Sequence, residues 1–179
     1  MKATGIVRRM DDLGRLVIPR EIRRTLRIRE GDPLEIFTAN DGEVILKKYS
    51  PLGELTPFAT DYAEALAKGT ALPVIITDRE QCIAVSGLPK KEILNRRITQ
   101  SLEDILTARQ FTTFKKDDAK SLTPLEGVEG TACIVAPIIS SGDITGAVVF
   151  LQGTSGNFSE SDAKLAQVAA AFLGNQTDE

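Results

Sequence analysis

The chain has 179 residues, of which 42% are hydrophobic and 26% charged, a composition typical of a folded protein with room for two small domains. The absence of histidine excludes a serine–histidine triad and histidine metal ligands, and two cysteines are too few for the usual four-ligand zinc site or for a disulfide framework. The net charge of −3 is unevenly spread, because residues 1–50 hold eleven basic and eight acidic side chains whereas residues 51–179 hold eleven and seventeen. The N-terminal part is therefore expected to bind an anionic partner.

The sequence also lacks the signals of several other protein classes. No apolar run approaches the roughly 20 residues that a membrane helix needs, and the start MKATGIVRRM has arginines where a secretory signal has an apolar stretch. Neither of the phosphate-binding patterns GxxxxGKS/T and GxGxxG occurs. We therefore expect a cytoplasmic protein without a membrane partner, catalytic residues or a metal site, in which Cys82 and Cys133 are buried, reduced thiols.

The first fifty residues are predicted to form short strands around one short helix. Asp11–Gly14 is a turn signal that follows a segment rich in β-branched residues. Pro19 suits the first position of a helix over Arg20–Leu26, and Asn40–Gly42 favours a tight hairpin. The predicted strands are, in chain order, Thr4–Met10, Leu16–Ile18, Leu34–Thr38 and Glu43–Tyr49.

This N-terminal segment is too small to be stable alone. About fifty residues with a handful of large apolar side chains bury too little surface to offset the loss of chain entropy. Disulfides and metals, which stabilise many small domains, are excluded by the composition. Association of chains remains, and we expect an obligate dimer at least.

Arginines gather on the predicted N-terminal helix. With about 100° between successive residues, four of them fall on one face, opposite the apolar residues. Like charges three and four positions apart repel, so this face favours an anionic partner, the phosphates of DNA, over a merely solvated surface. The four residues are Arg20, Arg23, Arg24 and Arg27.

Further arginines flank the predicted turn. Arg8 ends the first strand and Arg15 opens the second, so a tight turn brings both into one basic patch. Arg9 points to the opposite side from Arg8, because strand side chains alternate, and a surface or interface position is the stronger interpretation for it.

Residues 51–55 are predicted as a linker or the start of a connecting helix, and a second module spans residues 56–179. Thr56 is the favoured cap of the helix, because Pro57 in a helix interior would cost about 3 kcal/mol. The helix is expected to end at Gly69, with one face made by Phe58, Tyr62, Ala65 and Leu66.

The rest of the second module alternates strands and helices. Residues 90–108 look helical in two pieces, with Ser101 as a candidate cap. A C-terminal helix is predicted after the cap Ser159, with Asp162 completing a capping box. Its predicted core-facing residues are Leu165, Val168, Ala169, Phe172 and Leu173. The predicted strands are Leu72–Thr77, Cys82–Ser86, Thr131–Ile139 and Ile144–Leu151.

The motifs GIVR, LGR and EIRR follow one another in residues 1–50 and precede the run DGEVILKKY. In these motifs the segment resembles the AbrB family of bacterial transition-state regulators. The resemblance implies a swapped-hairpin β-barrel, in which two chains interleave their strands into one intertwined dimer that binds double-stranded DNA at varied AT-rich targets, chosen largely by DNA shape. The contacts it implies are Arg8, Arg15, Arg23 and Arg24, with Lys2 and Arg9 as auxiliaries.

The second module has the apolar segments VIITD, CIAVSG, ACIVAPIIS and ITGAVVFL. It resembles a GAF domain, an antiparallel sheet flanked by helices, which makes the whole chain an α+β protein. The pairing of the two modules resembles that of sporulation-stage activators and repressors, and implies a nucleoid-associated tetramer assembled through the GAF domains. GAF domains usually bind a small molecule; an effector of unknown identity and a role in assembly alone both stay open, and no cofactor is assigned.

Two other functions compete with DNA-binding regulation. An antitoxin would share the swapped-hairpin barrel, but antitoxins normally carry a short, poorly folded tail, which the strands and capped helix of the second module disfavour. A GAF-type thiol reductase acting through Cys82 or Cys133 would need a thiolate, which the apolar strands around both cysteines disfavour.

Overall fold

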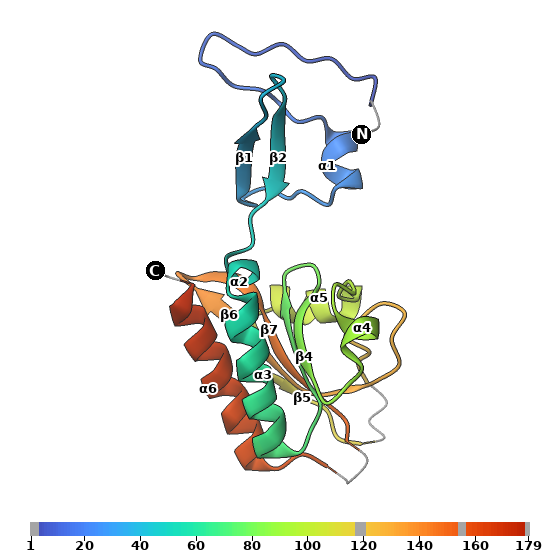
Figure 1. Cartoon of the computed structure of the whole chain (residues 1–179). Coiled ribbons are helices and arrows are strands. Elements are labelled where there is room, and N and C mark those ends of the chain that lie inside the picture. Colours follow the sequence, from blue (N-terminus) through green and yellow to red (C-terminus); the bar gives the residue numbers. More distant parts are fainter. Residues whose placement is uncertain (1–3, 117–120, 154–156, 178–179) are drawn as a thin grey trace. The chain divides into compact units, whose positions relative to one another are not determined.

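The computed structural model describes residues 4–116, 121–153 and 157–177, and it divides into two compact units (Figure 1). The first unit ends at Tyr49 and the second begins at Ser50. Among the described residues no helix is long and apolar enough to cross a lipid bilayer.

The first unit contains one helix and one hairpin. The elements are α1 (Arg20–Thr25), β1 (Leu34–Thr38) and β2 (Val44–Lys48). The strands pair antiparallel with Leu34 opposite Lys48. In the loop between them Gly42 takes φ of +83°, a left-handed conformation that glycine adopts without strain. The hairpin predicted around Asn40–Gly42 is confirmed.

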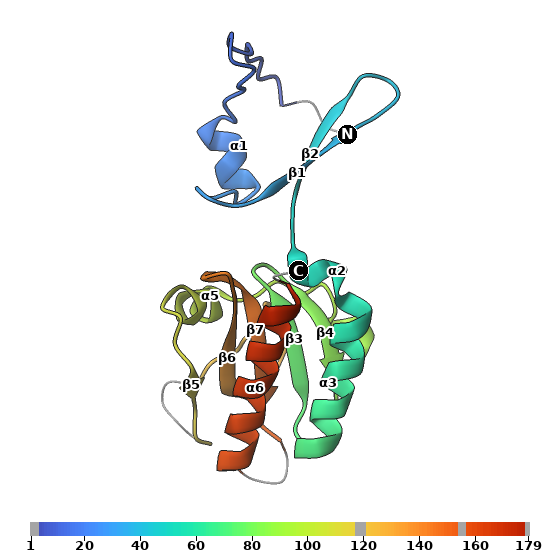
Figure 2. The same cartoon turned by 90° about the vertical axis from the view of Figure 1, so that its left-hand side faces the viewer.

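The predicted strands Thr4–Met10 and Leu16–Ile18 are not formed in the single chain. Between residues 4 and 19 the backbone follows an open arc with one turn in it, drawn in dark blue in Figures 1 and 2. A strand exists only through hydrogen bonds to a neighbouring strand, and one chain provides no neighbour for either segment. Their apolar side chains stand in solvent, with Val7 85% and Val17 72% exposed.

No apolar core forms within the first unit. From residue 4 to residue 49, Pro19 is the only buried residue. The hairpin is no better covered than the arc, since Ile36 is 66% and Val44 67% exposed. The shortage of core expected from the composition is therefore present in the folded chain.

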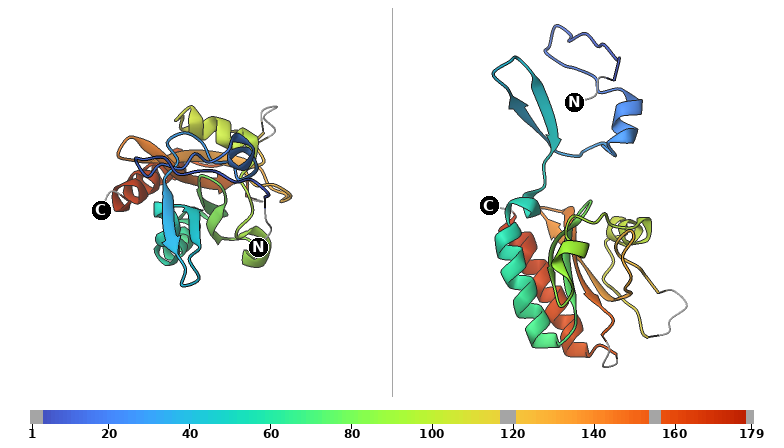
Figure 3. Two further views of the ribbon diagram at one scale, coloured as in Figure 1. Left: turned by 90° about the horizontal axis from the view of Figure 1, so that it is seen from above. Right: turned by 45° about the vertical axis from the view of Figure 1, so that its right-hand side comes forward.

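The second unit is built on a five-stranded antiparallel sheet in the order β4-β3-β7-β6-β5. Helices α3 and α6 lie side by side over one face of it, and α4 and α5 lie over the other (Figures 1, 2 and 3). The strands are β3 (Val74–Asp78), β4 (Cys82–Ser86), β5 (Thr112–Thr113), β6 (Ala132–Ser140) and β7 (Asp143–Leu151). The helices are α2 (Pro51–Glu54), α3 (Thr56–Thr70), α4 (Lys90–Ile93), α5 (Gln100–Thr107) and α6 (Glu160–Gln176).

Each face of the sheet has its own core. Val74 and Ile76 of β3 belong to the cluster under α3 and α6, which also contains Phe150. Ile75 lies between them in sequence and packs on the other side, in the cluster that contains Leu102 of α5. Because both faces are covered, the central strands are continuous apolar runs rather than alternating ones.

A proline lies in the first turn of each of two consecutive helices. Pro51 is the first residue of α2, and the Ser50 hydroxyl caps that helix by accepting the N–H of Gly53 at 3.1 Å. The prediction of Thr56 as the cap of the next helix is wrong, because Thr56 is already its first residue and Pro57 its second. The Thr56 hydroxyl instead donates to the carbonyl oxygen of Gly53 at 2.6 Å. It is occupied at the end of α2 and does not cap α3.

Two other helix ends differ slightly from the prediction. Helix α3 continues past Gly69 and stops where Ala71 adopts a left-handed conformation with φ of +55°. Residues 90–108 do form two helices, but α5 is capped by Thr99, whose hydroxyl accepts the N–H of Leu102 at 3.4 Å, and not by Ser101.

The start of α6 is as predicted, and its buried face is as predicted only at Ala169 and Leu173. Ser159 and Asp162 form the reciprocal capping box. Most of the residues that face the sheet are small, and α6 lies so close to β6 that a Cβ on Gly174 would stand 2.2 Å from the carbonyl oxygen of Ile139. The buried residues are Ala166, Ala169, Ala170, Leu173 and Gly174. Three residues of the predicted core face are exposed instead, namely Leu165, Val168 and Phe172.

One of these exposed residues, Phe172, meets aromatic residues of α3. The ring of Phe172 lies 5.8 Å from that of Phe58 and 5.6 Å from that of Tyr62, measured between centroids. Phe58 is itself 39% exposed, so the face predicted for α3 is also partly solvent-facing. We call this surface the α3–α6 apolar face; its residues are Phe58, Tyr62, Leu165, Val168 and Phe172.

The close approach of α6 to β6 predicts opposite effects for alanine at two helical glycines. Gly174→Ala should lower the free energy of unfolding by about 1–3 kcal/mol, because the new methyl group has no room. Gly69→Ala in α3, where a Cβ would have nothing within 4 Å, should raise it by up to about 1 kcal/mol through helix propensity. Urea unfolding followed by circular dichroism measures both. Equal stability of the two variants would contradict the tight α6–β6 packing.

Candidate nucleic-acid interface

Helix α1 is short and strongly basic. Pro19 precedes it with φ of −57° and Glu21 lies in its first turn, where a negative charge is favourable. Arg23 and Arg24 occupy its last turn, where positive charge is favourable. The Arg23 Nε donates a hydrogen bond to the carbonyl oxygen of Ile18 at 3.1 Å, which holds this side chain against the segment that enters the helix.

The described candidate arginines are all exposed, but they do not all lie on the helix. Arg20 joins the two last-turn arginines on α1, whereas Arg8 and Arg9 lie in the extended arc. The prediction that Arg27 continues the helical stripe is wrong, since α1 ends at Thr25 and Arg27 has a left-handed backbone with φ of +53°. Lys2 lies outside the described residues.

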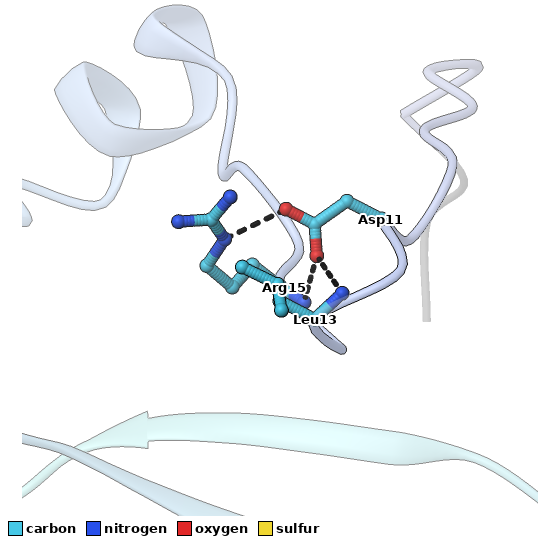
Figure 4. Close-up of polar contacts among 3 residues, drawn as sticks. All are labelled: Asp11, Leu13 and Arg15. Carbon is cyan, nitrogen blue, oxygen red and sulfur yellow. Dashed lines mark hydrogen bonds and ion pairs between the residues drawn. The ribbon is translucent and has the colours of Figure 1, made fainter.

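Arg15 is held by the turn that precedes it (Figure 4). One carboxylate oxygen of Asp11 accepts the backbone N–H groups of Leu13 and Arg15, at 3.1 and 2.7 Å. The other accepts the Arg15 Nε at 2.7 Å, forming an ion pair. These hydrogen bonds, led by that of the Arg15 backbone, hold the pKa of Asp11 below its usual value. The sequence identified the turn but gave no sign of the ion pair within it.

A lysine of β2 fixes the loop after α1. Lys48 Nζ donates to the carbonyl oxygen of Arg27 and lies 3.7 Å from a carboxylate oxygen of Asp32. The left-handed turn that ends α1 is thereby joined to the hairpin. Lys48 is consequently part of the framework that carries the arginines.

The second unit contains no cluster of metal ligands in the part that the structure describes. No group of three or more histidine, cysteine, aspartate or glutamate side chains is placed there to hold a metal ion. Both cysteines are buried, and burial raises the pKa of Cys82 to about 12 and that of Cys133 to about 11. Each thiol donates to a backbone carbonyl, that of Ala84 or that of Phe150.

Each of the two units matches a known protein family. Residues 54–178 match the family described as stage V sporulation protein T C-terminal, transcription factor. Residues 7–53 match the family described as antidote-toxin recognition MazE, bacterial antitoxin. The chain thus combines a small arginine-rich unit with a sheet-and-helix unit that matches the sporulation protein T family. This combination defines the class of the protein, a two-domain transcription factor. Within that class, the chain belongs to the stage V sporulation protein T family.

Two proteins of Bacillus subtilis (strain 168) support this assignment. Stage V sporulation protein T is 51% identical over 181 residues, which cover the whole of both chains. Transition state regulatory protein AbrB is 63% identical over 51 residues, 28% of this chain and 52% of that one. The resemblance of the first fifty residues to the AbrB family is confirmed.

Solved structures support the fold of the second unit. The GAF domain of an Acinetobacter phosphoenolpyruvate-protein phosphotransferase has a TM-score of 0.57 at 12% identity, covering 73% of this chain and 84% of that one. A type II free methionine-R-sulfoxide reductase from Thermoplasma acidophilum has a TM-score of 0.51 at 16% identity, covering 69% and 94%. At such low identity both show the GAF fold alone.

The raised pKa values predict cysteines that do not react in the folded protein. With pKa values raised to about 12 and about 11 by burial, Cys82 and Cys133 are almost wholly protonated at pH 8, whereas the reactive form of cysteine is the thiolate. Ellman's reagent should therefore label neither residue at pH 8 within minutes, and should label both once guanidinium unfolds the chain. Rapid labelling of the folded protein would contradict this prediction and would favour the thiol reductase hypothesis.

Proposed function

We propose that this chain regulates sporulation-stage genes by binding double-stranded DNA through a dimer of its first unit. The observation that carries the proposal is a set of exposed arginines on a unit that has no core of its own. The proposed DNA contacts are Arg8, Arg15, Arg23 and Arg24, with Arg9, Arg20, Arg27 and Lys2 as auxiliaries.

The state of these arginines supports phosphate binding. In the described part of the chain, Arg8, Arg23 and Arg24 form no ion pair with a carboxylate. Unneutralised, exposed guanidinium groups attract the phosphates of DNA, release bound counterions and form bidentate hydrogen bonds with phosphate oxygens. Helix α1 has only 6 residues, so its arginines act mainly as a charged edge rather than as a recognition helix.

The dimer is proposed from the open arc of the first unit. Its two extended segments have no strand partner in one chain, and their apolar residues, such as Val7 and Val17, are exposed. A second chain with the same segments would satisfy both needs at once, by pairing the backbones and covering the side chains. Interleaved strands of this kind form a swapped-hairpin barrel, in which the arginines of both chains lie on one folded unit.

A second association is proposed through the α3–α6 apolar face. Its three rings form one cluster, and two of them are 39% and 40% exposed. Val168 beside them is 62% exposed. Large apolar residues gathered on two adjacent helices are typical of a helix-packing interface between subunits. We propose that a second copy of this face covers it, so that dimers assemble into a tetramer with two DNA-binding heads.

The proposed target, chromosomal DNA, places the protein at the nucleoid in the cytoplasm. The second unit serves assembly, and sensing of a small-molecule effector is a further role of its GAF fold; no cofactor is proposed. Nor do we propose a catalytic activity. The thiol reductase alternative is disfavoured because burial keeps both cysteines protonated.

An antitoxin is the second candidate function. The match of residues 7–53 to the MazE family favours it. Against it, the remainder of the chain is a folded sheet covered on both faces, whereas the segment by which an antitoxin grips its toxin is normally short and poorly folded.

Removal of arginines from α1 should weaken DNA binding in a salt-dependent manner. Arg23→Ala/Arg24→Ala deletes four positive charges from each dimeric head, so the slope of log affinity against log salt should fall by about 3 to 4. Fluorescence anisotropy with a duplex of mixed sequence, between low and moderate salt, measures this slope for the full chain.

A matched control removes two exposed arginines of the second unit. Arg97→Ala/Arg109→Ala makes the same change in net charge on residues outside the proposed DNA contacts and should leave the slope unchanged. If the control and the α1 variant behave alike, the DNA-binding surface lies elsewhere and the proposed assignment is wrong.

A charged residue on the α3–α6 apolar face should dissociate the proposed tetramer into dimers. Val168→Glu places a carboxylate in the middle of the proposed interface and should convert tetramers into dimers, whereas Gln167→Glu, one position away and outside the apolar stripe, should not. Size-exclusion chromatography with light scattering distinguishes the two masses. Tetramers of unchanged stability in Val168→Glu would exclude this face as the interface.

A further inference from the structure

The turn from Asp11 to Arg15 fixes both the backbone and one side chain. The backbone N–H of Asp11 donates to the Arg15 carbonyl at 3.1 Å, and the N–H of Gly14 donates to the Asp11 carbonyl at 3.0 Å. Gly14 has φ of +73°, which closes the turn at a position that suits glycine. Three side-chain contacts of Asp11 add to these, so one residue anchors the whole turn.

The ion pair of Asp11 uses only one edge of the Arg15 guanidinium. Its carboxylate accepts a hydrogen bond from Nε, whereas neither of the two terminal nitrogen atoms donates to it (Figure 4). Within the described residues no other acceptor engages the Arg15 side chain. An arginine held by Nε can still bind a second acceptor with the two N–H groups at the end of its guanidinium. The direction of these groups is then set by the hydrogen bond of Nε.

We propose that Asp11 is a positioning residue for DNA recognition, which holds Arg15 by Nε so that its terminal N–H groups face the DNA in one fixed orientation. The inference rests on the proposed function, because it requires Arg15 to contact DNA. Asp11 does not attract DNA itself, since its carboxylate repels phosphates. Its contribution is therefore to selectivity: a fixed fork suits one geometry of the DNA, whereas a free arginine would satisfy any phosphate in reach.

The neighbouring Asp12 provides a natural comparison. It lies in the same turn, is exposed and carries the same charge. In the described structure its side chain has no hydrogen bond or ion pair. Asp12→Asn thus removes a negative charge from almost the same place without touching Arg15. Asp11→Asn removes the charge and weakens the ion pair, but its amide oxygen can still accept the two backbone N–H groups that shape the turn.

The experiment compares full-length variants on two DNA probes. One probe is a duplex selected by the unaltered protein from a random-sequence pool, and the other is a mixed-sequence duplex of equal length. The variants are Asp11→Asn, Asp12→Asn, Arg15→Ala and the double variant Asp11→Asn/Arg15→Ala, each with a melting temperature recorded. The readout is the ratio of the two affinities at fixed salt.

Asp11→Asn should lower this ratio by about fivefold, the effect of an exposed ion pair at the upper end of its usual range. Affinity for the mixed-sequence duplex should not fall, because a repulsive charge has been removed. Asp12→Asn should leave the ratio unchanged. In the Arg15→Ala background, Asp11→Asn should have no further effect on the ratio, since the residue through which it acts is gone.

The outcomes separate this inference from the function on which it rests. If Arg15→Ala binds both probes as tightly as the unaltered protein, the proposed contact of Arg15 with DNA is wrong. If Arg15→Ala weakens binding but Asp11→Asn changes the ratio no more than Asp12→Asn does, only the positioning role is overturned. A lowered ratio in Asp11→Asn that persists in the Arg15→Ala background would also overturn it, because Asp11 would then act through the fold of the turn.

Discussion

The first unit cannot bury its apolar side chains by itself, and the arrangement of its functional groups follows from this. From residue 4 to residue 49 only Pro19 is buried, while Val7, Val17 and Ile36 stand largely in solvent. Burial of apolar surface is the main favourable contribution to folding, so this unit needs a surface from a second chain. The proposed intertwined dimer provides that surface and presents each DNA-contacting arginine twice about a two-fold axis. Folding of the first unit and formation of its DNA-binding surface would then be the same event.

In the second unit, one close contact decides what the outer surface looks like. The backbone of α6 approaches β6 so closely at Gly174 and Ile139 that the facing side of the helix consists of alanine and glycine apart from Leu173. The large residues Val168 and Phe172 are left on the outside. A helix that packs mainly by alanine and glycine against its own sheet leaves its larger residues for the proposed contact with another copy.

The sequence predicted those features that depend on neighbouring residues along the chain. The hairpin around Gly42 and the capping box of Ser159 and Asp162 are local, and both are present. Features that depend on what lies across the fold were missed. Periodicity marked α6 as amphipathic, but which apolar stripe faces the sheet is decided by the distance to β6. The predicted arginine stripe wrongly included Arg27, because α1 ends at Thr25 and Arg27 has a left-handed backbone. The contact of Asp11 with Arg15 required the shape of the turn, which composition does not contain.

If the α3–α6 apolar face joins two dimers as proposed, it has a consequence for how tightly the protein holds a long DNA molecule. Two heads joined in one tetramer bind as a bivalent ligand: once the first head is seated, the second searches a small volume at an effective concentration far above that of the free protein. Avidity of this kind multiplies modest affinities without any new contact to a base. It also makes binding sensitive to the spacing of two sites along the duplex. The aromatic cluster of Phe58, Tyr62 and Phe172 would in this way set the reach and the cooperativity of repression or activation.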